Sequence, residues 1–278
     1  MKTRINMGLI EKLKKNGFSF NKSLGQNFIV DEGFLTSVVS EIGLSKNDLV
    51  VEIGTGAGTL TRVLSNYVKQ VHTFEVDKRL EPILALQFKD KNNINLVFKD
   101  ALKYDFNDLV NENFKVVANI PYYITTPLLM KFILDENCKE ICVLVQEELA
   151  NRIVAKCGTK DFGALSVTMQ TWGECKIIKH VSRNLFTPSP NVESAVAQIR
   201  RLGNVQITES FSNLVKGLFS FRRKTMLNAL SQYLCLDKVA VAKILHSAQI
   251  PPDIRPEKVS VNKFNELENI IQKQTKID

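Results

Sequence analysis

The most constraining feature of this sequence is an alternation of short apolar runs with segments of helical periodicity, which begins at residue 49. The apolar runs occupy residues 49–53, 71–76, 94–98, 114–118 and 141–145, and the helical segments occupy 60–67, 80–88, 127–134 and 147–156. Strands that are apolar along their whole length are typical of a parallel sheet covered on both faces. The alternation therefore predicts an α/β fold with a doubly wound, mostly parallel sheet.

The rest of the chain extends this plan at both ends. Asp31 is a good N-cap for a helix whose apolar residues run from 34 to 42. Two further strand-like runs, at 175–181 and 194–199, precede a linker at Gly203 and Asn204, and only helical periodicity follows. We predict a basic, partly mobile N-terminal arm at 1–22, an α/β domain at 23–202 and a small C-terminal helical domain at 203–278.

A glycine-rich turn and two acids follow the first three runs. Gly54, Gly56 and Gly58 alternate with other residues directly after the first run, so the backbone there can turn tightly and approach a ligand. Glu75 lies at the end of the second run, where a carboxylate can hold both hydroxyls of a ribose. Asp100 follows the third run and can accept a hydrogen bond from an adenine amino group. The pattern predicts a nucleoside-containing cofactor.

The fourth run leads into Asn119, Ile120, Pro121 and Tyr122. The Asn119 side-chain oxygen and a nearby backbone carbonyl can accept the two hydrogens of an exocyclic amine, while an aromatic ring stacks on the heterocycle. A turn that ends a strand beside a core tyrosine is the alternative interpretation. These four residues alone leave both interpretations open.

Composition indicates what kind of molecule the protein binds and in which cell compartment it is expected. The 278 residues are 44% hydrophobic and carry a net charge of +8, which favours a polyanion such as nucleic acid, although a Lys-rich surface also serves solubility. The five cysteines show no paired spacing and the three histidines are scattered, so we expect reduced thiols and no metal. No apolar run approaches the roughly 20 residues that span a bilayer. We expect a cytoplasmic protein that does not bind membranes.

Four segments carry a resemblance to a known family. They are residues 25–28, 52–58, 119–122 and 186–194, within a similarity that extends from about Leu24 to about Leu267. With them the sequence resembles the class I S-adenosylmethionine-dependent methyltransferases, which have a Rossmann-like sheet, and specifically the ribosomal RNA adenine dimethyltransferase family. The glycine spacing differs from the dinucleotide GxGxxG pattern, which disfavours a nicotinamide dehydrogenase.

The resemblance implies S-adenosyl-L-methionine as cofactor and assigns roles to single residues. Thr55 departs from the proline that is common in the family, and we expect this to leave binding intact even where it loosens the turn. The implied cofactor residues are Asn27 and Ile29 at the methionine end, Gly54 and Gly56 at the sulfonium, Glu75 at the ribose, Asp100 and Ala101 at the adenine, and Asn119. The implied catalytic residues are Asn119, Ile120, Pro121 and Tyr122, with Tyr122 and Phe186 stacking on opposite faces of the target base.

A basic run points to the polyanionic partner. Arg222, Arg223 and Lys224 are expected to open a helix and contact RNA phosphates, supported upstream by Lys12, Lys14, Lys15 and Lys22. This run resembles the branch of the family that acts on the bacterial small (30S) ribosomal subunit. The resemblance then implies dimethylation of the N6 amines of two adjacent adenosines, in a hairpin loop near the 3′ end of 16S rRNA, by a monomeric enzyme.

Two alternatives remain from the sequence. An erythromycin-resistance methyltransferase shares the catalytic segments and acts on 23S rRNA, but the run at 222–225 and the segment Arg255-Pro256-Glu257 stand against it. An RNA-binding assembly factor without catalysis is the other, and the intact Asn119–Tyr122 segment stands against that one.

Overall fold

The chain forms two compact units in a computed structural model that describes residues 8, 10, 11, 13, 15, 17–106 and 112–275. The first unit contains the described residues up to Ala150 together with Ile177–Ile199. The second contains Asn151–Lys176 and the described residues from Arg200 onward. The sequence predicted that the α/β domain ends, and the C-terminal helical domain begins, at 202/203. The second unit also takes in 151–176, because helix α7 (Ala164–Trp172) packs on helices of the C-terminal segment.

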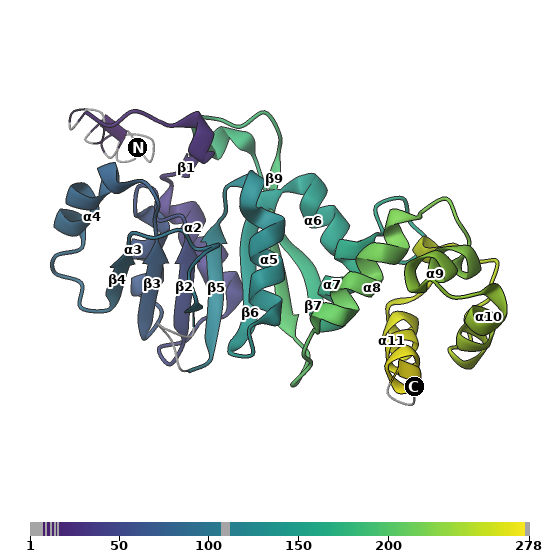
Figure 1. The fold of residues 1–278 in the computed structure, drawn as a ribbon. Coiled ribbons are helices and arrows are strands. Elements are labelled where there is room, and N and C mark those ends of the chain that lie inside the picture. The colour runs from purple at the N-terminus through teal and green to yellow at the C-terminus, as the bar shows by residue number, and fades with distance from the viewer. Residues whose placement is uncertain are drawn as a thin grey trace. The chain divides into compact units, whose positions relative to one another are not determined.

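A seven-stranded sheet forms the centre of the first unit (Figure 1), and its strand order is β4-β3-β2-β5-β6-β9-β7. The first five strands in that order are parallel to their neighbours. The strands are β2 (Leu49–Ile53), β3 (Gln70–Phe74), β4 (Ile94–Val97), β5 (Phe114–Asn119), β6 (Cys138–Gln146), β7 (Gly173–Val181) and β9 (Ser194–Arg201). The predicted doubly wound, mostly parallel sheet is confirmed.

The strand order reverses at β2. Val50 of β2 pairs with Val71 of β3 on one side and with Lys115 of β5 on the other, both in parallel. Successive strands therefore extend one way from β2 to β4 and the other way from β5 to β6. At such a reversal the connections leave in opposite directions and open a crevice at the carboxyl ends of the strands.

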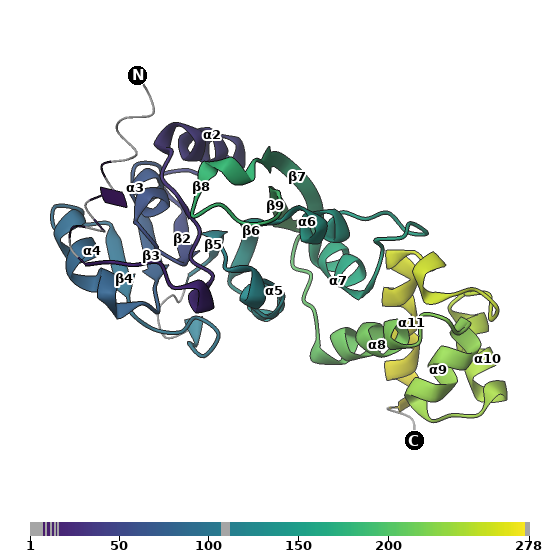
Figure 2. The ribbon, with the colours of Figure 1, turned by 90° about the horizontal axis from the view of Figure 1, so that it is seen from above.

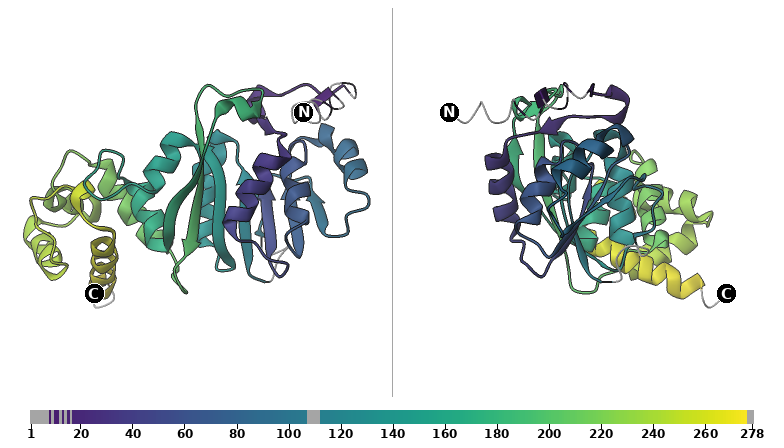
Figure 3. Two further views of the ribbon diagram at one scale, coloured as in Figure 1. Left: turned by 180° about the vertical axis from the view of Figure 1, so that it is seen from behind. Right: turned by 90° about the vertical axis from the view of Figure 1, so that its left-hand side faces the viewer.

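Helices cover both faces of this sheet, with α2 and α3 on one face and α5 on the other (Figures 2 and 3). The Asp31 carboxylate caps α2 by accepting from the Phe34 N–H at 3.0 Å, as predicted. The apolar face of α2 is buried in a core that includes strand residues such as Val117. The helices of this unit are α2 (Glu32–Ile42), α3 (Thr59–Ser65), α4 (Glu81–Gln87), α5 (Thr125–Leu134) and α6 (Glu147–Ile153), which extends into the second unit.

Aromatic rings fill the space between the sheet and α5. Phe106 lies 5.3 Å from Phe74 of β3 and 5.1 Å from Phe132 of α5, measured between ring centroids. Tyr104 also packs on Phe74, at 5.0 Å. These contacts fix the segment that follows β4, which carries Asp100.

The start of the described chain packs on the first unit. Ile10 and Leu13 are buried in a cluster with Phe18 and Phe28, so these two residues of the predicted N-terminal arm at 1–22 belong to a core. Strand β1 (Phe28–Ile29) pairs antiparallel with β8 (Phe186–Thr187). Lys12, Lys14 and the side chain of Lys22 lie outside the described residues.

The second unit is helical beyond β9, as predicted. Phe219 stacks on Phe264 at 5.8 Å and meets Phe162 edge-on at 6.2 Å. The basic run at 222–224 lies in the turn between α8 and α9 and not on a helix, because Thr225 is the N-cap of α9. The helices are α7, α8 (Glu209–Ser220), α9 (Met226–Leu234), α10 (Lys238–Ser247) and α11 (Val261–Thr275).

The structure also bears on the thiols and on membranes. All five cysteines are free, as expected, and two of them, Cys157 and Cys235, are exposed. Within the described ranges, every helix is too short or too polar to cross a bilayer.

Glu52 is a fully buried acid in β2, beneath the glycine-rich turn. Its Oε2 accepts from the Thr61 hydroxyl at 2.6 Å, whereas Oε1 has no hydrogen-bond partner among the described residues. Burial raises the pKa of Glu52 to about 8. The folded protein therefore holds a proton on Glu52 at neutral pH.

This pKa makes stability depend on pH. Between the ordinary value of 4.5 and about 8, the folded state binds a proton that the unfolded state has released, so stability falls as pH rises. Relative to Glu52→Gln, which cannot titrate, the free energy of unfolding of the wild type should fall by roughly 1 kcal/mol per pH unit. Denaturant unfolding of both proteins at pH 5.5, 7 and 8.5 checks this, and parallel pH profiles would contradict it.

Candidate cofactor and substrate site

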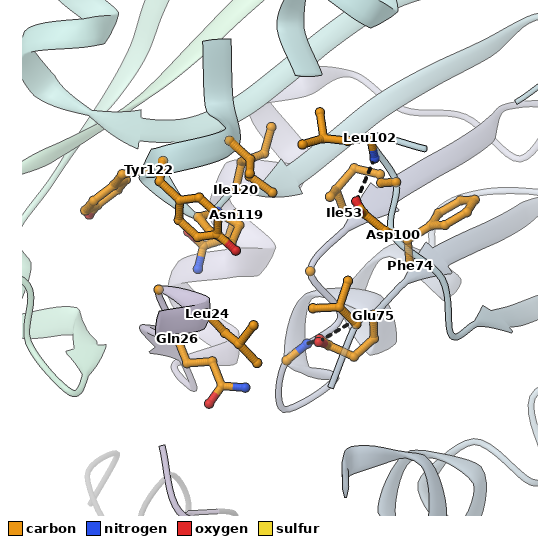
Figure 4. A pocket seen from close by; sticks show the side chains of 18 of the residues that line it. Leu24, Gln26, Ile53, Phe74, Glu75, Asp100, Leu102, Asn119, Ile120 and Tyr122 are labelled. Carbon is orange, nitrogen blue, oxygen red and sulfur yellow. Dashed lines mark hydrogen bonds between the residues drawn. The ribbon is translucent and has the colours of Figure 1, made fainter. Parts of the chain in front are cut away.

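A cavity of about 390 Å³ lies at the carboxyl ends of β2, β3, β4 and β5, in the first unit. Asn119, Ile120 and Tyr122 lie together on one side of it, across from Glu75 and Asp100 (Figure 4). The crevice expected at the strand-order reversal is therefore present. It brings together the glycine turn, both acids and the Asn119 segment, as the sequence predicted. The lining comes from residues 24–28, 53, 54, 56, 74–76, 99–102 and 119–124.

The glycine-rich turn lies close to the end of β5. Gly54 has φ +82°, and a Cβ there would lie 3.3 Å from the Asn119 carbonyl oxygen. Gly56 has φ +54°, and a Cβ there would lie 2.9 Å from the Phe28 ring. Both positions favour glycine by conformation and by space. They let the two halves of the site meet without side chains filling the cavity.

Three backbone N–H groups hold the Glu75 carboxylate. Its Oε2 accepts from Gly56 at 2.9 Å, and its Oε1 accepts from Val76 and Asp77, each at 2.9 Å. Burial raises the pKa of Glu75, and these donors act against that rise. A carboxylate offers about four acceptor positions. Oε2, which uses one of its two, retains capacity for a ligand hydroxyl.

Lys131 of α5 holds the loop that carries Asp100. Its ammonium donates to the carbonyls of Ala101 at 3.0 Å and Leu102 at 2.9 Å, and also to that of Tyr104. The Asp100 carboxylate accepts from the Leu102 N–H at 3.0 Å. One cation thus ties the predicted adenine-binding residues to the helix that follows the Asn119 segment.

An ion-paired network fastens the segment 24–28 beside Glu75. The Gln26 amide donates to Asp77 at 2.8 Å, and Arg79 donates to both oxygens of Asp77, at 2.8 and 2.6 Å. These bonds from Arg79 hold the pKa of Asp77 below its usual value. The Arg79 guanidinium lies 5.2 Å above the Phe18 ring. Asn27, whose backbone lines the cavity, is therefore held next to Asn119.

The Asn119 amide is oriented by one hydrogen bond. Its Nδ2 donates to the Asn27 carbonyl at 3.0 Å. Its Oδ1 has no hydrogen-bond partner among the described residues. Because the nitrogen is committed to Asn27, the oxygen is the group available to accept from a ligand amine.

The structure does not bring every predicted residue to the cavity. Phe186 is 4% exposed and packed in the core with Ile29, its partner across β1 and β8, and neither lines this cavity. That placement does not support stacking of Phe186 on a base. Tyr122 lines the cavity with its ring half-buried, and its hydroxyl bonds to Ser194 at 2.9 Å. Burial raises the pKa of Tyr122.

Sequence reasoning assigned no separate role to several contributors to the site, among them Val76, Tyr123 and Lys131. Val76 and Tyr123 line the cavity although they are 48% and 60% exposed, and Lys131 supports it from α5. Val76 and Tyr123 directly follow Glu75 and Tyr122, so adjacency was the available signal. Exposure, the property that distinguishes them, cannot be read from sequence.

These residues fit S-adenosylmethionine. An acidic acceptor with spare capacity stands where a ribose would lie, and glycines leave room beside it. Asp100 and Ala101 present an acceptor and a small apolar surface for an adenine. Glu75, Gly54, Gly56 and Asp100 would hold the cofactor, with the segment 24–28 beside it.

Comparison with known proteins identifies the family. The model of the ribosomal RNA adenine dimethylase family matches residues 17–273. The chain belongs to that family. Ribosomal RNA small subunit methyltransferase A of Clostridium botulinum is 41% identical over 273 residues, covering 95% of this chain and 98% of the relative. The protein of the same name in Enterococcus faecalis is 40% identical over 277 residues, covering 95% and 94%.

Solved structures agree in fold. A dimethyladenosine transferase from Plasmodium falciparum superposes with a TM-score of 0.75 at 24% identity, covering 87% of this chain and 96% of that one. The 23S rRNA methyltransferase ErmE superposes with a TM-score of 0.68 at 24% identity, covering 88% and 100%. This dimethylase is thus an S-adenosylmethionine-dependent enzyme with the Rossmann-like fold of methyltransferases.

The Lys131 contacts predict a specific effect on cofactor binding. In Lys131→Met three carbonyls lose their donor and the loop with Asp100 loosens, so cofactor affinity should fall about tenfold, as for the removal of one charged hydrogen bond. Calorimetric titration with S-adenosylhomocysteine measures this. Lys139→Met is the control, since among the described residues the Lys139 ammonium donates only to the Glu136 carbonyl, at 2.7 Å. Equal affinities in wild type and Lys131→Met would contradict the role.

Proposed function

We propose that this dimethylase methylates the N6 amines of two adjacent adenosines in a hairpin loop near the 3′ end of 16S rRNA, within the small ribosomal subunit. The observation that carries the chemistry is Asn119, whose amide is fixed by Asn27 with its oxygen free at the cavity. The choice of the small subunit is supported by relatives about 40% identical that are named small-subunit methyltransferases.

Asn119 acts on the nucleophile. The lone pair of an adenine amine is delocalised into the ring, so the amine attacks poorly. Accepting one amine hydrogen at Asn119 Oδ1 and the other at the Ile120 carbonyl favours a pyramidal nitrogen with its lone pair free. S-adenosylmethionine supplies an electrophilic methyl group when bound. The site positions the amine for in-line attack, and the proton leaves the methylated amine to water.

Cavity dimensions restrict the state of the RNA. An adenine within a duplex cannot enter a cavity of about 390 Å³ between Tyr122 and Glu75, so the target base must be unpaired or flipped out. A hairpin loop presents its bases in that way.

The positive charge of the chain is segregated. Within 151–176 and 200–278 there are seventeen Lys and Arg against nine Asp and Glu, whereas the remaining residues carry twenty of each. The entire net charge of +8 therefore belongs to the second unit. Arg222, Arg223 and Lys224 are exposed there. We assign phosphate contacts to this unit, since such contacts position RNA without reading its sequence.

One incubation tests the proposed function. Purified protein with labelled S-adenosylmethionine and unmethylated small subunits should yield N6,N6-dimethyladenosine, identified by chromatography of the digested RNA. Large subunits should remain unlabelled. Label in the large subunit would favour the 23S alternative, and no transfer would favour an assembly factor.

Asn119→Ala tests the role of Asn119 in the reaction. Loss of a preorganised partner of this kind costs on the order of 10²–10³ in rate, and here the loss should fall on kcat with cofactor affinity unchanged. Monomethyladenosine should also accumulate, because the second transfer starts with one amine hydrogen already replaced. A folded Asn119→Ala protein that dimethylates at the wild-type rate would show that another group holds the amine.

Replacing Arg222, Arg223 and Lys224 together by Gln tests the RNA surface. Affinity for the subunit should fall, and the slope of log affinity against log salt should flatten by about 0.7–0.9 for each phosphate that the protein no longer neutralises. Lys46, Lys69 and Lys89 form the control set, because they are exposed and precede β2, β3 and β4, at the edge opposite the cavity. Identical slopes for the two triple variants would contradict the assignment.

A further inference from the structure

Tyr123 is an exposed aromatic residue that lines the cofactor and substrate cavity. Its side chain is 60% exposed, which is unusual for a ring beside a cavity lined by buried residues such as Ile120. Within the described part of the chain, the ring stacks on no other aromatic ring and its hydroxyl has no hydrogen-bond partner. The cavity therefore presents an unoccupied aromatic surface to solvent.

The Tyr123 ring nevertheless contacts the protein on one side. Gly25, at φ +63°, has no side chain, and a Cβ there would lie 3.4 Å from Tyr123 Cε1 and 3.2 Å from Pro121 Cβ. The ring thus lies against the bare backbone of Gly25. A ring restricted by such a contact loses less conformational entropy when a ligand stacks on it.

The two other aromatics expected to contact the RNA are less exposed than Tyr123. Phe186 is 4% exposed in the core, and the half-buried Tyr122 has its hydroxyl bonded to Ser194 at 2.9 Å. Tyr122 can still face a base inside the cavity, next to Asn119. Of these three rings, the Tyr123 ring is the most exposed, so it is the one that an RNA base outside the cavity can reach.

We propose that Tyr123 is a stacking site for the nucleotide next to the target adenosine. This inference rests on the proposed function, in which two neighbouring adenosines are modified. While Asn119 holds the amine of one adenosine, the base of the other stacks on Tyr123. Stacking on an aromatic side chain tolerates any base, so the contact positions the RNA and leaves selection of adenine to Asn119.

The kinetic test compares two substitutions. Tyr123→Phe keeps the aromatic face and should behave as wild type. Tyr123→Leu keeps an apolar contact with Gly25 but has no aromatic ring on which a base can stack. The KM for unmethylated small subunits should therefore rise about tenfold, within the range expected for removing one base stack. Cofactor affinity should be unchanged in both. Equal KM values for all three proteins would overturn the inference, as would an equal loss of cofactor affinity in Tyr123→Leu, which would make Tyr123 a cavity wall.

Fluorescence tests the stacking itself. An RNA hairpin of the loop sequence carries 2-aminopurine in place of one of the two adenosines. Since 2-aminopurine lacks the 6-amino group, the unlabelled adenosine is the one that Asn119 can hold. Quenching of the label should be deeper on wild type and Tyr123→Phe than on Tyr123→Leu, and equal quenching would overturn the proposal. If wild type bound the hairpin but failed to methylate small subunits, the proposed function would fail independently of Tyr123.

Discussion

The reversal of strand order between β2 and β5 is the constraint on which the rest of the site depends. The reversal leaves a crevice at the carboxyl ends of the parallel strands. The glycines after β2 lack side chains that would fill this crevice, so a cavity remains there. A Cβ at Gly54 would lie 3.3 Å from the Asn119 carbonyl oxygen, so the glycine-rich turn and the Asn119 turn approach each other through backbone alone. In the proposed function, the methyl donor and the target amine meet where these two turns meet.

The two units differ in net charge. The cavity in the first unit is built from acceptors held by the chain itself, with Glu75 fixed by three N–H groups and Asn119 by Asn27. That unit carries no net charge, whereas the second unit carries the whole excess of cations. In the proposed function, surface charge on the second unit can thus tune affinity for a polyanion without disturbing the acceptors assigned to the cofactor and the amine.

Much of this arrangement could be predicted from sequence because it follows local patterns. The continuous apolar runs predicted the strands. Because Gly54, Glu75, Asp100 and Asn119 lie at the ends of these strands, the sequence also predicted that they lie near one another. The burial of Phe186 could not be predicted, because it depends on the pairing of β8 with β1, which are distant in sequence. The placement of Tyr123 could not be predicted either, because its ring packs against Gly25, almost one hundred residues earlier in the chain. The division of 151–176 from the first unit likewise depends on tertiary packing of α7.

Amide hydrogen exchange with and without S-adenosylhomocysteine tests the placement of the cofactor most directly. The ligand should slow exchange in peptides that cover residues 24–28, 54–58, 75–77 and 100–102, each of which includes residues that line the cavity. Peptides from α8 to α11 should exchange at the same rate in both samples. Protection confined to the second unit, or absent from 54–58 and 75–77, would contradict the account.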